Sequence, residues 1–143
     1  MKAKPFLLDV NVLLALAWPN HLHHREAAAW FAQNRRNGFR TCPLTQTGFV
    51  RISSNPAFTP DAVSPLQAVD LLTRIAAMPG HDFWADDLPL PAAMDGARIL
   101  GHRQVVDLYL LRLSAHHGGI FATLDGGAAA LAKREAIPAV LVG

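Results

Sequence analysis

Short apolar runs alternate along the chain with longer segments in which apolar residues recur at helical spacing. A short apolar run bounded by turn residues predicts a buried strand, whereas helical spacing predicts an amphipathic helix. We therefore predict strands over residues 6–8, 39–42, 81–85, 120–124 and 139–142, and helices over residues 12–18, 21–37, 43–52, 65–78, 102–117 and 126–135. Asn20 stands where it could cap the second helix.

Strands that alternate with helices need crossover connections, and such connections produce a parallel sheet with helices on both faces. The 143 residues contain no repeat, no low-complexity tract and no linker long enough to separate two domains. The sequence therefore predicts an α/β fold. We expect one domain, residues 1–143, built as a three-layer α/β/α sandwich around a central parallel sheet of about five strands.

The first predicted strand ends on a carboxylate. The apolar run Phe6-Leu7-Leu8 stops at Asp9, and an equally apolar helix begins at Val12. Removing an unpaired carboxylate from water costs several kcal/mol, so Asp9 needs a cation or strong hydrogen-bond donors. Ligands of open parallel sheets bind at the carboxyl ends of the strands, which makes Asp9 a candidate metal ligand. The alternative is that Asp9 only caps the helix after it.

Two further carboxylates belong to the same part of the predicted fold. Asp125 ends the fourth strand, and Asp107 lies inside the helix that leads into that strand, on one face with Leu110 and Leu111. Carboxylates from separate elements suit Mg²⁺ or Mn²⁺, which prefer oxygen ligands. The alternatives are an N-cap role for Asp125 and an ion pair between Asp107 and Arg103.

Composition and charge narrow the class of protein. A hydrophobic fraction of 51% with 17% charged residues argues against disorder. The net charge of +2, carried mainly by arginine, permits a nucleic-acid partner without requiring one. Arg51, Arg98 and Arg103 are candidates for contacts with an RNA backbone. The single cysteine, Cys42, excludes an internal disulfide, and we expect it to be a small buried residue.

The N-terminus has some features of a signal peptide, because Lys2 and Lys4 precede an apolar stretch. Asp9 and Asn11 interrupt that stretch, and no other run approaches the ~20 apolar residues of a membrane span. We therefore expect a soluble cytoplasmic protein without a membrane partner. The histidines at 21–24 and 116–117 have no cysteine nearby to complete a zinc site, so we expect no zinc.

Taken together, these segments resemble a PIN domain, and specifically the VapC-type ribonuclease toxins of type II toxin–antitoxin systems. The matching segments follow the family's order over nearly the full length: residues 6–16, 42–51, 54–56, 106–110 and 122–125. The resemblance implies a Mg²⁺- or Mn²⁺-dependent endoribonuclease that hydrolyses RNA with a metal-activated water. It also implies a cognate antitoxin that silences the enzyme, and a homodimer.

The resemblance also implies roles for individual residues. Asp9 and Asp107 match the family's principal metal-binding acids, and Asp125 matches a further acid of the same catalytic pocket. Thr123 matches a polar position beside that pocket, and Asn11 fits a supporting role.

One departure from the family pattern leaves alternatives open. Gln46 stands where the family usually has a glutamate, and its uncharged amide lowers the expected metal affinity. A catalytically weak or silent binding domain is therefore the main alternative. A phosphohydrolase of the haloacid dehalogenase type would use Asp9 as nucleophile, but Asn11 cannot supply the proton that its mechanism requires. The apolar helix surface around residues 27–31 is a candidate site for an amphipathic partner segment.

Overall fold

The computed structural model describes residues 3–98 and 101–143. Five strands form one sheet in the order β3-β2-β1-β4-β5, and every neighbouring pair is parallel. The strands lie where the apolar runs predict them: β1 (Phe6–Leu8), β2 (Phe39–Thr41), β3 (His81–Phe83), β4 (Ile120–Thr123) and β5 (Ala139–Leu141). The predicted α/β fold with a parallel sheet is confirmed.

The helices also follow the predicted segments, with small shifts at their ends. They are α1 (Val10–Ala17), α2 (His24–Asn34), α3 (Pro43–Ser53), α4 (Pro65–Ala76), the short α5 (Leu90–Ala93), α6 (Val105–His116) and α7 (Gly126–Arg134), with 3₁₀ turns η1 (Arg35–Asn37) and η2 (His102–Gln104). Within residues 3–98 and 101–143, no helix combines the length and the apolar character that crossing a membrane requires.

The predicted cap at Asn20 is wrong. Helix α2 begins after His23, which makes no side-chain capping bond, and the Asn20 amide donates to the Asp61 carboxylate instead. The intervening residues form turns, so the helical spacing read from the sequence extends beyond the helix itself.

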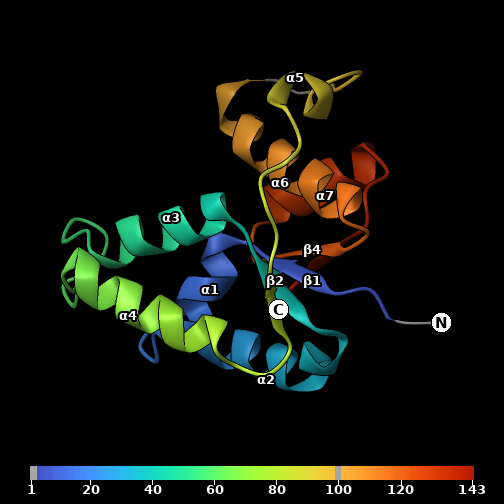
Figure 1. Cartoon of the computed structure of the whole chain (residues 1–143). Coiled ribbons are helices and arrows are strands. Elements are labelled where there is room, and N and C mark those ends of the chain that lie inside the picture. Colours follow the sequence, from blue (N-terminus) through green and yellow to red (C-terminus); the bar gives the residue numbers. More distant parts are fainter. Residues whose placement is uncertain (1–2, 99–100) are drawn as a thin grey trace.

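The core has two halves, one on each face of the sheet. Phe6 and Leu8 of β1 pack with α1 and α2, whereas Leu7 points to the opposite face and packs with α6 and α7. This alternation follows from the two-residue period of a strand. In Figure 1, α1 and α2 lie on one side of the sheet and α6 and α7 on the other. The predicted three-layer sandwich is confirmed.

The strand order creates a switch point beside the central strand. From β1 the chain adds β2 and β3 on one side, and later β4 and β5 on the other. The carboxyl ends of β1 and β4 are neighbours, because Leu8 pairs with Ala122 and the Asp9 N–H donates to the Ala122 carbonyl at 2.9 Å. Ligands of parallel sheets bind at such a switch point.

Candidate active site

Asp9 follows the last residue of β1 and caps α1. Its side chain is only 8% exposed, and both carboxylate oxygens accept hydrogen bonds: Oδ1 from the Val10 N–H at 2.7 Å and Oδ2 from the Thr123 hydroxyl at 2.8 Å. Burial raises the pKa of Asp9, although these two bonds lower it, and the charge of Asp125 raises it further. Asp9 therefore does cap α1, as the alternative interpretation expected. The two hydrogen bonds also hold its buried carboxylate in one orientation at the switch point.

Thr123 and Asn11 hold Asp9 in that orientation. The Thr123 hydroxyl donates its proton to Asp9 and accepts from the Asp125 N–H at 3.0 Å and from the Asn11 amide at 3.3 Å. The Asn11 carbonyl oxygen accepts from the Leu124 N–H at 3.0 Å. Because the hydroxyl is used as one donor and two acceptors, its rotation is fixed. Both residues therefore lie beside Asp9, as the resemblance implies.

Asp107 lies in the first turn of α6 and is half-buried. Among the described residues it makes no ion pair, so the alternative of a pair with Arg103 is not realised. Arg103 is exposed in the turn before α6. Burial, together with the negative charges of Asp9 and Asp125, raises the pKa of Asp107 to about 6. The helix therefore places a carboxylate in the field of two others, and none of the ion pairs among the described residues neutralises it.

Asp125 follows β4 and caps α7. Its Oδ1 accepts from the Gly127 N–H at 2.8 Å, and the residue is exposed, so the predicted cap role is confirmed. The carboxylate still lies close enough to raise the pKa values of both Asp9 and Asp107 through its charge. Asp125 therefore contributes to the negative field of the site while one of its oxygens is occupied by the helix.

The three carboxylates do not form a closed cage. Within residues 3–98 and 101–143, no three histidine, cysteine, aspartate or glutamate side chains lie close enough together to hold one metal ion. The reason is local, since Asp125 is turned toward its own helix and Asp9 is bonded to Val10 and Thr123. Mg²⁺ keeps several waters and commonly takes only one or two protein carboxylates. An oxygen-only donor set with unbalanced negative charge fits such an ion.

Among the described residues, Gln46 bonds to Thr41 and not to the carboxylates, although it stands where the family usually has a glutamate of the metal pocket. Its amide Nε2 donates to the Thr41 hydroxyl at 3.0 Å, and the same hydroxyl lies 2.8 Å from Nε2 of His81. Thr41 ends β2, so Gln46 joins a polar chain along the β2–β3 side of the sheet edge. No described bond links it to Asp9.

Comparisons with known proteins identify the family of this chain. No family model matches the chain. Ribonuclease VapC39 of Mycobacterium tuberculosis (strain H37Rv) is 45% identical over 125 residues, which cover 86% of this chain and 90% of that protein. Ribonuclease VapC38 of the same strain is 44% identical over 129 residues, covering 90% of this chain and 91% of that protein. The chain belongs to the VapC ribonuclease family.

Solved structures show the fold of this VapC-family chain independently. VapBC2 from Rickettsia felis, bound to a DNA fragment from its promoter, superposes with a TM-score of 0.65 at 9% identity and covers 96% of this chain and 98% of that one. FitAcB from Neisseria gonorrhoeae gives 0.61 at 18% identity, covering 94% and 95%. The family and the PIN-like fold expected from the sequence are confirmed.

Arg51, one of the three arginines singled out in the sequence, shares a cavity wall with Asp9. It is exposed on α3 and lines a cavity that also contains Asp9. The sequence analysis did not single out Thr47 or Val106, which also lie in this wall. The spacing of residues 44, 47, 48 and 51 on one helix face is the signal that would have found the α3 part.

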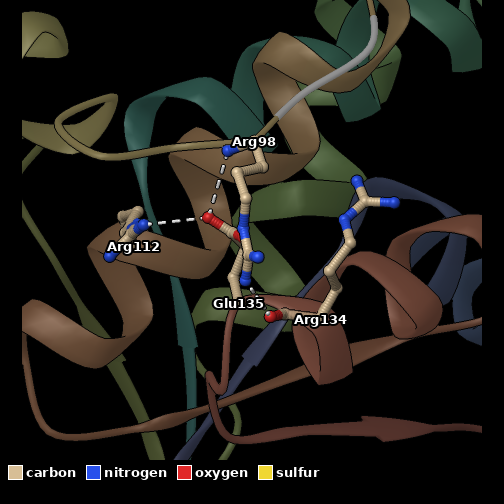
Figure 2. A network of polar contacts seen from close by, with 4 residues as sticks. All are labelled: Arg98, Arg112, Arg134 and Glu135. Atoms are coloured by element: carbon tan, nitrogen blue, oxygen red, sulfur yellow. Dashed lines mark hydrogen bonds and ion pairs between the residues drawn. The ribbon is translucent and has the colours of Figure 1, made fainter.

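Arg98 has a different role in this VapC-family chain. Figure 2 shows it beside Glu135, the residue after α7, together with Arg112 of α6. The Glu135 carboxylate is only 3% exposed and lies 3.7 Å from Nε of Arg98 and 3.3 Å from a guanidinium nitrogen of Arg112. Asp125 and Glu135 flank opposite ends of α7. Arg98 therefore forms an exposed ion pair with Glu135, and its contact with RNA stays a prediction.

The Glu135 ion pairs predict a measurable asymmetry in stability. Glu135→Gln should lower the free energy of unfolding by about 2 kcal/mol, because it leaves the half-buried Arg112 without its counter-charge. Arg98→Ala is the matched control and should cost under about 1 kcal/mol, since that guanidinium is 75% exposed. Urea unfolding measures both values. Equal losses in the two variants would show that the pairs do not differ in strength.

Proposed function

We propose that this chain is a Mg²⁺- or Mn²⁺-dependent endoribonuclease that hydrolyses RNA phosphodiesters and acts as the toxin of a toxin–antitoxin pair. One observation carries the proposal. Asp107 is a half-buried carboxylate without a cationic partner among the described residues, and it is placed in the field of Asp9 and Asp125. A protein gains nothing in stability from such an arrangement, so a cation is the natural partner.

In this proposal Asp9 and Asp107 hold the ion, and Asp125 adds to the attraction. Thr123 fixes the Asp9 carboxylate, and Asn11 fixes Thr123, so the ligand oxygen is oriented before the ion arrives. When bound, a divalent ion of this kind lowers the pKa of a water and neutralises charge on a phosphate. The exposed Arg51 beside Asp9 would bind a neighbouring phosphate of the RNA backbone.

Two other functions are less well supported. A silent binding domain would be favoured by Gln46, but the relatives that match most of this chain are named ribonucleases. A phosphohydrolase with Asp9 as nucleophile would need a proton donor two residues later. Asn11 is instead bonded to Thr123 and Leu124 and carries no acidic proton. The ribonuclease proposal gives these Asn11 bonds a role, because Asn11 holds Thr123 and Thr123 holds the Asp9 carboxylate.

Metal removal tests the proposal directly. The purified protein should cleave a mixed RNA pool in Mg²⁺ or Mn²⁺, and excess EDTA should abolish that cleavage because the carboxylates alone cannot activate water. Restoring either ion, followed by mapping of the RNA ends, should restore the same cut sites. Cleavage that persists in EDTA would contradict the proposal. Cleavage that survives in an Asp107→Asn preparation would also contradict it, because the activity would then come from a contaminating nuclease.

We also infer how the antitoxin binds. The helix surface around residues 27–31, which the sequence predicts as a partner site, is partly buried, because Ala27 and Phe31 belong to the core. Beside it lies a cavity of about 340 Å³ between α1, α2 and α4, with Ala28 and Leu16 in its wall. An apolar segment of the antitoxin fits such a site.

In the cleavage assay the antitoxin should inhibit the wild type but not the Ala28→Arg variant. That variant should itself cleave RNA as the wild type does. Inhibition of both proteins would place the antitoxin at another surface.

Two further expectations, one from the resemblance and one from the sequence itself, remain part of this proposal. We expect a homodimer, which sedimentation of the isolated protein measures. We also expect a cytoplasmic location, in keeping with an RNA substrate and with Cys42, which is buried and free. Cell fractionation checks the second expectation.

A further inference from the structure

A cavity of about 300 Å³ opens directly beside Asp9. Its wall comes from three helices: Leu44 and Gly48 of α3, Val10 of α1, and Val106 and Leu110 of α6. This volume is near the lower end of the range of small-molecule sites, about 300–1,000 Å³. The wall is mainly aliphatic, so the cavity differs in character from the carboxylate site that it adjoins.

The position of α3 gives the cavity its shape. A Cβ on Gly48 would lie 2.8 Å from a methyl carbon of Val10, which is closer than carbon atoms normally approach. The glycine therefore lets α3 pack tightly against the start of α1, next to Asp9. This contact fixes one wall of the cavity relative to the carboxylate, independently of any ligand.

Polar groups are confined to the edge of the cavity. Thr47 and Arg51 are exposed, whereas Asp9 is buried. The Thr47 hydroxyl donates to the Pro43 carbonyl at 2.7 Å and keeps its lone pairs available. Among the described residues, the Arg51 guanidinium has no carboxylate partner. The wall of this cavity therefore combines aliphatic side chains with the buried Asp9 and with an arginine that has no ion-pair partner among the described residues.

We propose that this cavity receives one nucleobase of single-stranded RNA, adjacent to the phosphodiester that is cut. The inference rests on the proposed function and adds a base-binding subsite to it. A nucleobase that leaves its stack can be held between aromatic or apolar side chains. Arginine and lysine bind the phosphates of the backbone beside it. One cavity wall contains all three kinds of group that this needs: Asp9 for a metal-bound phosphate, aliphatic side chains for the base, and Arg51 for a neighbouring phosphate.

The experiment pairs an abasic scan with a variant that fills the cavity. Val106 is 51% exposed, so Val106→Trp can occupy the cavity without displacing the core. Fluorescence anisotropy in EDTA measures the affinity for a short single-stranded RNA in which each base is removed in turn. For the wild type, one abasic position should weaken binding about tenfold, in line with the loss of one buried base. Val106→Trp should bind intact RNA about tenfold more weakly and should be insensitive to that abasic position.

A control variant separates cavity filling from the addition of a tryptophan. Leu90→Trp on α5 has a similar exposure, 48%, and lies outside the cavity wall, so its abasic profile should match the wild type. Equal affinity of the wild type for every abasic RNA would overturn the subsite. The subsite would also be overturned if Val106→Trp, but not Leu90→Trp, changed the oligomeric state measured by sedimentation, because a second copy of the chain would then occupy the cavity. Because binding is read in EDTA, a base-dependent profile in a protein that never cleaves RNA would support the subsite while removing the proposed nuclease function.

Discussion

Asp9→Asn should lower RNA cleavage by at least about 1,000-fold while the protein stays folded. The substitution keeps the shape of the side chain of a residue that is only 8% exposed, and its oxygen can still accept from the Val10 N–H. It removes the charge that would hold a divalent ion, and such ions contribute several kcal/mol of transition-state stabilisation. A loss of about 4 kcal/mol corresponds to the expected factor. Single-turnover cleavage of a defined RNA measures it.

The stability of the same variant provides the internal check. Burial raises the pKa of Asp9, so the ionised carboxylate is costly to the metal-free fold. Asp9→Asn should therefore melt no lower than the wild type at neutral pH, even though the Thr123 hydroxyl loses an anionic acceptor. Asp95→Asn, at an exposed aspartate outside the site, should leave both cleavage and melting unchanged. Undiminished cleavage by a folded Asp9→Asn would remove Asp9 from the chemistry.

The fold was largely predictable because its signals are local. A buried strand such as Phe6–Leu8 has to be a short apolar run, and its position in the middle of the sheet follows from the crossovers around it. The end of α2 was also readable, since Gly38 has a positive φ of 87° that ends the helical segment. The start of α2 was not, because the Asn20 amide finds Asp61 far along the chain.

The site was predictable to the extent that position in the sheet determines it. Asp9 and Thr123 end neighbouring strands, so they had to meet once the strand order was known. The orientation of side chains on helices was not predictable in the same way. Gln46 bonds to Thr41, five residues earlier at the end of β2, and Arg98 pairs with Glu135, far along the chain at the end of α7. No periodicity within one helix records those partners.

Asp107→Asn should raise the melting temperature of the metal-free protein at pH 7.5 by about 3 °C and leave it unchanged at pH 4. The folded protein raises the pKa of Asp107 from the ordinary 3.8 to about 6. Ionisation is therefore harder in the folded state, and the resulting destabilisation is absent below about pH 4, grows up to about pH 6 and is complete above it. Since the group is half-exposed, we expect about 1 kcal/mol, which is about 3 °C for a domain of this size.

Addition of Mn²⁺ should reverse the order of the two proteins. An ion that binds only the folded state stabilises the wild type by about 2.7 kcal/mol at one hundred times its Kd, whereas Asp107→Asn has lost a ligand and should gain far less. Scanning fluorimetry with and without Mn²⁺ at both pH values separates the two effects. A gain of equal size at pH 4 would attribute the stabilisation to packing rather than to charge. If Mn²⁺ raised the melting temperature of Asp107→Asn as much as that of the wild type, Asp107 would not be a metal ligand, and the repulsion between the carboxylates would have no role in metal binding.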